Sequence, residues 1–347
     1  MSHTKKGTLT VHFSIGFGNN IFQYVFARLV AEKNNLFLCS PGIPELGINP
    51  TESVIDQSLP FIHIGNEGYK TGIYDKHLKA DYSNHNVIVK GGFYEDYTLY
   101  QPYLEKIRNW FRPSLYKRNT TDLVIHFRLQ NRLVMVNHYL NFIEPYEYKN
   151  VIDQFSFDKL HIVTDAEKWD YHNKDDIKRI RKDIMKGPNP GAYKIKTNES
   201  IDYMNSLVDV LSEYNPIIHT SQEGTIPGSG ALRGGFIDAF DYVRSFDQGI
   251  LYNSTFSWWA LVLGGAKEVG VFSQWKPGRK DNQPNLGETA YPGWFRWGKS
   301  ESLISQRPEV QKYAKLSWSK RTFWPRKINK AIKAVRALKK IIFLGKS

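Results

Sequence analysis

Apolar positions along the chain recur with two periods, and the change from one to the other predicts the order of strands and helices. Residues 8–15, TLTVHFSI, are rich in β-branched side chains and alternate between apolar and polar, as a half-buried strand does. The turn GFGNN follows, and after it Ile21, Val25 and Leu29 recur with helical spacing. The segment therefore predicts a strand, a tight turn and a helix, the opening of an α/β fold.

The same two patterns continue through most of the chain. Predicted strands are VIVKGGFYE, DLVIHFRL, FDKLHIVTD, PIIHT, QGILY and, as the last one, KEVGVF. Predicted helices are YLEKIRNWF, SIDYMNSLVDVLSEY, FIDAFDYVRSF and SWWALVLGG. Residues 221–235 are Gly-rich and predict a loop. Strands that alternate with helices favour an α/β architecture with parallel sheets.

The chain is long enough for two domains. Its 347 residues match about two domains of ordinary size, and the polar stretch YKRNTTD is where we expect the boundary. We accordingly expect an amino-terminal α/β domain over residues 1–117, a second α/β domain over 118–305 and a tail over 306–347. A cleft is expected between the two domains.

Positive charge is concentrated at the carboxyl end. The net charge is +13, and residues 310–347 contribute twelve Lys and Arg with no Asp or Glu, which leaves +1 for the rest. A nucleic-acid-binding protein would need a basic stripe on its globular part, so we expect no nucleic-acid partner. Residues 326–347 combine cations with apolar side chains at helical spacing. This pattern is typical of a helix on a membrane surface, and equally of a terminal helix that packs on the protein.

Cysteine content and the absence of long apolar runs bear on location. The single cysteine, Cys39, allows no disulfide within the chain, which favours a reducing compartment. The opening residues MSHTKKGTLTVHF lack the apolar run of a signal peptide, and no apolar run reaches the roughly 20 residues that span a bilayer. We expect a cytoplasmic protein whose tail is a candidate for peripheral contact with the inner face of a membrane.

The first candidate for chemistry is SIGFGNN, residues 14–20. Gly16 and Gly18 permit close approach of a ligand to the backbone, and the helix start that follows favours an anion. An ordinary strand-to-helix turn would explain the same residues. No third glycine follows at the spacing of a dinucleotide site.

Two further candidates lie on predicted strands. His126 and Arg128 are two residues apart, so they point to the same face of a strand. A guanidinium beside an imidazole suits a phosphate or diphosphate, although a structural ion pair would use the same residues. Asp165 ends another predicted strand, where α/β proteins bind ligands. Its carboxylate could accept from the N–H groups of a guanine base, or cap the next helix.

The motif NSTFSWW, residues 253–259, holds more small polar side chains than one helix start needs. A single N-cap oxygen satisfies one or two backbone amides, whereas Asn253, Ser254, Thr255 and Ser257 offer four side chains. The surplus beside the positive end of a helix suits a phosphate. The two tryptophans that follow are expected to anchor the helix in the core.

Together these stretches resemble glycosyltransferase family 11, the α-1,2-fucosyltransferases. The resemblance covers about residues 9–275 and is carried by GFGNNIFQYVFAR, GGFYEDYTLY, HFRLQNR and NSTFSWW, the last of which matches the family motif in full. It implies a GT-B-like fold of two Rossmann-like domains facing across a cleft. It also implies GDP-fucose as donor, no metal or other cofactor, and inversion at the anomeric carbon. The acceptor would be a galactoside hydroxyl of a glycan, lipid-linked if the tail binds a membrane.

The resemblance also implies roles for individual residues. Arg128 is expected to carry the main positive charge against the departing diphosphate. A carboxylate near the cleft would take the proton from the acceptor hydroxyl, and independently of the resemblance Glu95 and Asp96 are the candidates because they lie in the YED turn of the first domain. His126 and Asp165 would contact the nucleotide, with Asp165 at the guanine edge. The donor-binding set is Gly16, Gly18, Asn19, His126, Arg128, Asp165, Asn253, Ser254, Thr255 and Ser257.

One departure from the family pattern keeps other functions open. Leu129, Gln130 and Asn131 stand where the family motif usually contains a carboxylate. Transfer of another GDP-sugar and a catalytically inactive nucleotide- or glycan-binding protein are therefore alternatives to fucosyl transfer. A GTP switch and a metal-dependent hydrolase are not supported, because the chain has no G-x-x-x-x-G-K-[ST], no H-E-x-x-H and no Cys/His cluster.

Overall fold

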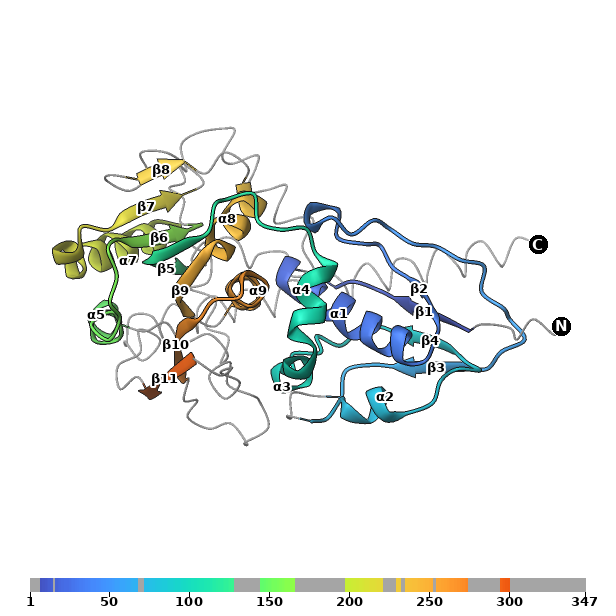
Figure 1. Ribbon diagram of the computed structural model, residues 1–347. Coiled ribbons are helices and arrows are strands. Elements are labelled where there is room, and N and C mark those ends of the chain that lie inside the picture. Colours follow the sequence, from blue (N-terminus) through green and yellow to red (C-terminus); the bar gives the residue numbers. More distant parts are fainter. Residues whose placement is uncertain are drawn as a thin grey trace, which may run out of the picture.

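The computed structural model describes nine segments, which together form two parallel β-sheets with helices packed against them (Figure 1). The predicted α/β class with parallel strands is confirmed. Arg128, the stretch 129–131, Asn253 and the basic tail from 306 lie outside the described residues. The described residues are 7–14, 16–67, 72–127, 144–165, 197–220, 229–231, 235–251, 254–273 and 294–299.

The first sheet has four strands in the order β2-β1-β4-β3. Its strands are β1 (Thr8–Val11), β2 (Phe37–Cys39), β3 (Phe61–Ile64) and β4 (Asn86–Val89). The helices of this half are α1 (Phe17–Lys33), α2 (Asp75–Lys79), α3 (Tyr97–Tyr100) and α4 (Leu104–Trp110), with short 3-10 turns η1 (Pro44–Leu46) and η2 (Gln101–Tyr103). The chain leaves β1 toward β2 on one side and returns through β3 and β4 on the other, so the strand order reverses between β1 and β4.

The second sheet has seven strands in the order β11-β10-β9-β5-β6-β7-β8. Its strands are β5 (Asn119–Phe127), β6 (Leu160–Thr164), β7 (Ile217–Thr220), β8 (Ser229–Ala231), β9 (Phe246–Leu251), β10 (Glu268–Ser273) and β11 (Trp294–Lys299). Its helices are α5 (Pro145–Ile152), α7 (Thr197–Val210), α8 (Gly235–Arg244) and α9 (Thr255–Gly264), with a 3-10 turn η5 (Ser212–Tyr214). This is a doubly wound order that reverses between β5 and β9.

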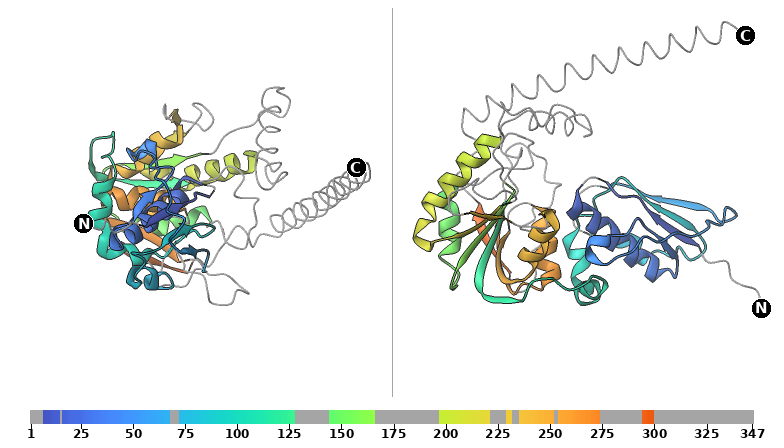
Figure 2. Two further views of the ribbon diagram at one scale, coloured as in Figure 1. Left: turned by 90° about the vertical axis from the view of Figure 1, so that its right-hand side faces the viewer. Right: turned by 90° about the horizontal axis from the view of Figure 1, so that it is seen from above.

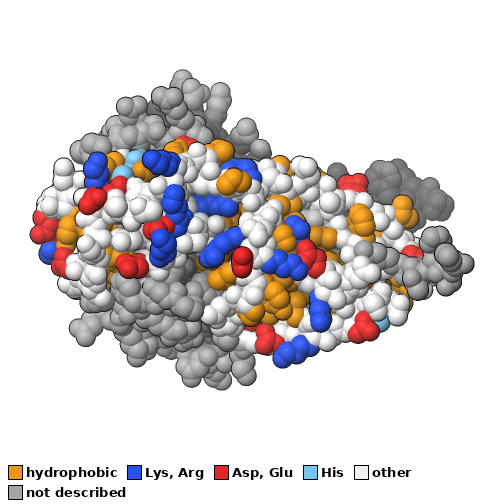
Figure 3. Space-filling view, viewed as in Figure 1, with side chains coloured by type: hydrophobic (Ala, Val, Ile, Leu, Met, Phe, Trp, Pro, Cys, Tyr) orange, Lys and Arg blue, Asp and Glu red, His pale blue; other side chains and the backbone are white. Residues whose placement is uncertain are grey.

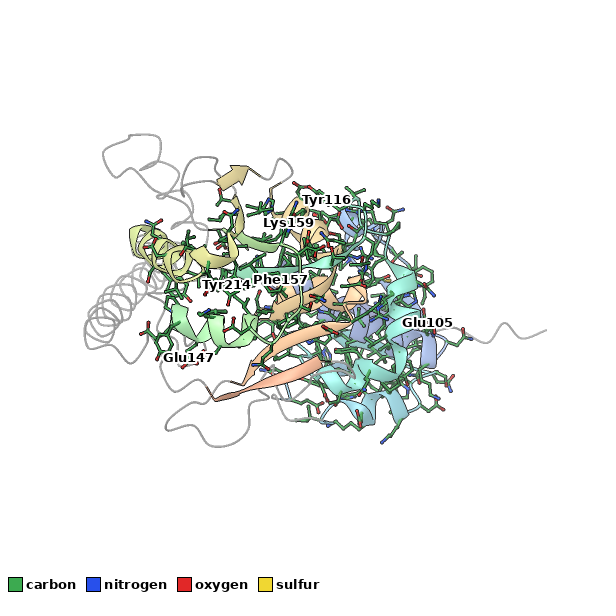
Figure 4. The ribbon with its side chains drawn as sticks, turned by 60° about the vertical axis from the view of Figure 1, so that its left-hand side comes forward. Glu105, Tyr116, Glu147, Phe157, Lys159 and Tyr214 are labelled. Atoms are coloured by element: carbon green, nitrogen blue, oxygen red, sulfur yellow. The ribbon has the colours of Figure 1, made fainter. Side chains whose placement is uncertain are left out.

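Alternate residues of the second sheet face two different cores. Ile125 and its neighbours pack with α5 and α7, where Phe157 and Tyr214 lie side by side with ring centroids 5.9 Å apart (Figure 4). Val124 faces α8 and α9 in a second cluster that continues into the first sheet. Figure 2 shows α1 facing α9 across this junction, where Phe22 stacks on Trp258 with centroids 5.1 Å apart. The predicted anchoring of the tryptophan pair is confirmed, since both are fully buried.

Arginines on α4 and on the segment from 111 to 118 tie the two halves together. Arg108 Nε donates to the Val262 carbonyl (2.8 Å), and Arg118 donates to the Gly265 carbonyl (3.0 Å), so both bind the carboxyl end of α9. Arg112 bridges the Glu45 carbonyl (2.8 Å) and the Asp241 carboxylate (2.6 Å). Lys and Arg side chains gather over the middle of the face seen in Figure 3.

Several predicted elements differ from the structure. The strand predicted over VIVKGGFYE ends at Val89 as β4, and the residues from Gly91 to Asp96 lie outside it. Strand β1 ends at Val11, short of residue 15, because the following residues form the turn into α1. KEVGVF is not the last strand, since β11 pairs with it in parallel. β8 lies inside the predicted loop 221–235, where the short segment SGA is held by pairing with β7. Among the described residues, no helix is both long and apolar enough to cross a membrane.

Candidate functional site

Both sheets place the predicted motifs at the points where their strand order reverses. In open α/β sheets, a ligand crevice forms beyond the carboxyl ends of the strands at this point. In the second sheet, His126 is the penultimate residue of β5, and the NSTFSWW motif follows β9. In the first sheet, the SIGFGNN motif follows β1, and the GGFYED segment follows β4. The topology thus collects four separate sequence motifs at the two points where the strand order reverses.

The small polar residues of NSTFSWW are divided among three tasks. Ser254 is the N-cap of α9, and its hydroxyl accepts from the Ser257 backbone N–H at 3.5 Å. Ser257 is fully buried, and its hydroxyl lies 2.6 Å from His126 Nδ1. Thr255 Oγ1 donates to Asn19 Oδ1 at 3.0 Å, which links the motif to the first sheet. One residue caps the helix, and the others join it to the two neighbouring motifs.

The amino ends of α1 and α9 meet at Gly18. A Cβ atom at this position would lie 2.5 Å from the Thr255 carbonyl carbon and 2.6 Å from the Phe256 nitrogen, so only glycine fits. Gly16 is the N-cap of α1 with φ 103°, a conformation that favours glycine. Two helix starts converge here, and each carries partial positive charge. This arrangement suits an anion such as a phosphate.

Aromatic side chains surround the meeting point. Phe17, at the start of α1, lies 5.2 Å from Phe236 and 5.2 Å from Phe240 between ring centroids. The His126 ring stacks on Phe256 at 4.9 Å. Phe236 is 55% exposed, so it offers an apolar surface beside the meeting point of α1 and α9. Sequence reasoning did not single out these phenylalanines, because a high overall content of aromatic residues does not show which of them lie near a site.

Glu95 is a carboxyl group with no hydrogen-bond or ion-pair partner among the described residues. Burial raises its pKa to about 7. It follows Tyr94, which adopts φ 54°, a left-handed conformation that is uncommon for residues other than glycine. Strained backbone beside an unpaired carboxyl group is typical of a functional position.

Asp96 has a different environment although it is the next residue. It is buried, and its carboxylate accepts from the Gly72 N–H (2.7 Å) and from Thr98 Oγ1 (2.8 Å). Burial raises the pKa of Asp96, and these hydrogen bonds oppose the effect. The geometry therefore gives Asp96 a structural task and favours Glu95 as the residue available for proton transfer.

Asp165 lies at the same carboxyl edge of the second sheet. It directly follows Thr164, which pairs with Phe127 of β5, and its backbone N–H donates to the Phe127 carbonyl at 3.3 Å. It is partly exposed. Arg128 and Asn253, which follow β5 and β9, lie outside the described residues, and so do the residues after Asp165, where we expect a helix for it to cap. The roles assigned to these three residues stay predictions.

Sequence reasoning missed Gln23, which links two of the motifs. It is fully buried on α1, and its amide contacts the segments after β1 and after β4. The signal in the sequence is a polar residue inside the apolar stripe Ile21 to Val25. Within the part of the chain that the structure describes, no group of three or more His, Cys, Asp or Glu could hold a metal ion.

Comparisons with known proteins give little support beyond the residues themselves. No protein-family model matches the chain, and no curated protein matches it either. Among solved structures, a mutant of Arabidopsis thaliana FUT1 in complex with GDP is similar, with 10% sequence identity and a TM-score of 0.39. The match covers 78% of this chain and 71% of that chain. A likeness this distant carries no argument about function, so the functional conclusion rests on the motifs and their geometry.

Proposed function

We propose that the protein is an inverting glycosyltransferase that moves fucose from GDP-fucose to a galactoside hydroxyl of a glycan. The observation that carries the proposal is the contact of Gly18 and Asn19 with Thr255. This contact joins the amino end of α1, beside the first sheet, to the amino end of α9, beside the second sheet. Each helix begins where the strand order of its sheet reverses. A diphosphate bound there would accept N–H donors from both halves, as expected for a GT-B-like transferase.

In the proposed reaction, the acceptor oxygen forms a bond to the anomeric carbon of fucose. At the same time, the bond between the anomeric carbon and the diphosphate oxygen breaks. The electron pair of that bond leaves on GDP, and the acceptor proton passes to the Glu95 carboxylate. A base with a pKa of about 7 is matched to this task near neutral pH. The developing negative charge on GDP would be stabilised by the two helix starts and, as the family resemblance implies, by Arg128 without a metal.

The remaining donor contacts follow from position. Asp165 would accept from the guanine N–H groups at the carboxyl end of β6, and His126 would be held beside the nucleotide by Ser257. Asn253 and Ser254 would complete the phosphate side at the start of α9. The residues from Gly16 to Asn19 would cover the diphosphate from the first sheet.

The proposal is tested by GDP release from GDP-fucose in EDTA, with lactose and N-acetyllactosamine as acceptors. We expect acceptor-stimulated release by the wild type and its loss in Arg128→Ala. Arg118→Ala is the matched control, because Arg118 binds the opposite end of α9, and it should keep its activity per folded molecule. Release from another GDP-sugar alone would replace fucose as the donor. GDP binding without release from any GDP-sugar would refute transfer and leave the inactive binding protein.

A further inference from the structure

Gln23 uses both N–H donors and the carbonyl oxygen of its buried amide to join two loops. Its Oε1 accepts from the Ser14 N–H at 2.9 Å, and its Nε2 donates to Ser14 Oγ at 3.0 Å and to the Gly92 carbonyl at 2.7 Å. The residue is fully buried. A primary amide has two N–H donors and one carbonyl acceptor, so no donor is left over.

The two loops are the ones that carry the proposed chemistry of the first sheet. Ser14 lies just before Gly16, the start of the anion-binding turn, and Gly92 lies just before Glu95. They follow β1 and β4, the two strands between which the strand order reverses. One side chain therefore links the two loops and sets their separation.

A rigid path leads from Gly92 to Glu95. The Tyr94 hydroxyl donates to the Ile64 carbonyl (2.9 Å), and the Tyr94 carbonyl accepts from the Tyr100 hydroxyl (2.6 Å). The Tyr94 ring stacks on Phe26 with centroids 4.4 Å apart and planes 6° apart. Phe26 and Gln23 are three residues apart on α1, so they share one face of the helix. A shift of Gly92 would consequently be transmitted to Glu95 rather than absorbed by the loop.

We propose that Gln23 is a positioning residue that fixes the Glu95 carboxyl group relative to the phosphate-binding turn. The inference rests on the proposed function, because it assigns Glu95 and the turn to one reaction. Gln23 touches neither reactant. Loss of its bonds would misplace the base relative to the donor, and a misplacement of about 1 Å can cost roughly 100-fold in rate.

The test compares Gln23→Met with a matched buried amide at the other end of the same sheet. Asn86 is 2% exposed, and it accepts from the Thr8 N–H (3.2 Å) and donates to the Asp56 carbonyl (2.8 Å). Gln23→Met and Asn86→Leu each remove buried hydrogen bonds at similar side-chain volume. Both should lower Tm.

Only Gln23→Met should change the reaction itself. We expect its kcat to fall about 10- to 100-fold with a much smaller change in KM for the donor. The acid limb of its pH–rate profile should also move away from pH 7, because the burial of Glu95 changes. Asn86→Leu should keep kcat within about twofold and leave the acid limb in place. Equal effects of the two variants on kcat and on the limb would overturn the inference.

Hydrogen exchange separates this inference from the proposed function and needs no activity. In Gln23→Met, amide exchange should rise in both segments, 12–16 and 91–96, relative to wild type and Asn86→Leu. Gln23→Glu keeps an acceptor for Ser14 but loses the donor to Gly92, so exchange should rise mainly in 91–96. If wild type transfers no sugar but these exchange patterns appear, only the proposed function fails. If exchange rises in neither loop, the positioning role of Gln23 is wrong.

Discussion

The amino ends of the second sheet differ from the meeting point of the two helix starts in how their polar groups are paired. At the amino ends, charged groups are paired: Asp122 binds His161 (3.1 Å), and Lys267 binds Asp247 (2.7 Å). At the carboxyl ends, two helix starts converge on Gly18, and the Glu95 carboxyl group has no partner among the described residues. Groups that are paired stabilise the fold, whereas unpaired groups held in place are available to a ligand.

Two histidines on the same face of the second sheet lie in different surroundings. His161 lies 3.2 Å from His219 and 2.9 Å from the Tyr242 hydroxyl, so its ring belongs to a network inside the protein. His126 Nδ1 lies 2.6 Å from the Ser257 hydroxyl at the start of α9, and the His126 ring stacks on Phe256. Near the same amino ends, Tyr116 donates to Asp238 of α8 (Figure 4). The residue type is the same in both cases. The two histidines differ in the end of the strands at which they lie.

The largest effect is expected at Glu95. Glu95→Gln should lower kcat by about 10²- to 10⁴-fold, the usual contribution of a positioned general base. In wild type, activity should rise with pH through about 7, because the raised pKa keeps Glu95 protonated below it. The same shift means that ionisation of Glu95 opposes folding, so stability decreases as the pH rises from the unfolded pKa toward 7. Glu95→Gln should therefore show a higher Tm than wild type at pH 8.

Asp96→Asn is the control for this prediction, since it tests the neighbouring carboxyl group. Asp96 accepts from Gly72 and Thr98, so its loss should lower stability by about 1–2 kcal/mol and leave kcat within roughly fivefold. The measurements are the pH–rate profile and thermal unfolding. A larger loss of kcat in Asp96→Asn than in Glu95→Gln would exchange the roles of the two residues.

The sequence predicted most of the parallel α/β elements because their apolar periodicity is local. It also placed the polar motifs at strand ends, where Thr255 and Asn19 do come together. The choice between Glu95 and Asp96 could not be made from the sequence, since it depends on which carboxyl group finds donors in residues 72 and 98. β8 and β11 escaped prediction because each is held by its neighbouring strand rather than by its own pattern.

The two ends of α9 provide the next comparison. Gly18 contacts the amino end of α9, and Gly264 is its last residue, where a Cβ would lie 2.1 Å from the Arg244 carbonyl oxygen. Gly18→Ala and Gly264→Ala should each lower the free energy of unfolding by about 1–3 kcal/mol through overpacking. GDP affinity, measured by calorimetry, should fall in Gly18→Ala and stay unchanged in Gly264→Ala. Equal losses of affinity would contradict an anion site at the start of α9.

Acid should lower the stability of the protein through the histidine cluster at the amino ends of the second sheet. Burial, with the charge of His161 as a smaller cause, lowers the pKa of His219 to about 4, and burial also lowers the pKa of His161. An unfolded histidine titrates near 6.5, so the unfolded chain gains protons below that pH and stability falls between about 6.5 and 4. Since His219 is partly exposed, we expect a loss of about 1–2 kcal/mol.

Thermal unfolding from pH 7 to pH 4.5 measures this loss. The titratable neighbours are Asp122, Lys159 and Tyr242. Burial raises the pKa of Tyr242 to about 12, so the histidines are the groups of this cluster that change charge between pH 6.5 and 4. His219→Gln should flatten the dependence of Tm on pH. An equally steep decline in His219→Gln would place the acid sensitivity elsewhere.

The smallest effect is expected from the hydroxyl that joins the two helix starts. Thr255→Val keeps the shape of the side chain but removes the bond to Asn19, which should cost about 0.5–1.5 kcal/mol. If that bond holds the two halves of the anion site in register, GDP affinity should fall by roughly 2- to 10-fold. Thr51→Val is the matched control, since Thr51 Oγ1 donates to the Leu38 carbonyl of β2 (2.7 Å) rather than to either helix start. An equal loss of stability in the two variants with no difference in GDP affinity would mean that the Thr255 bond serves the fold alone.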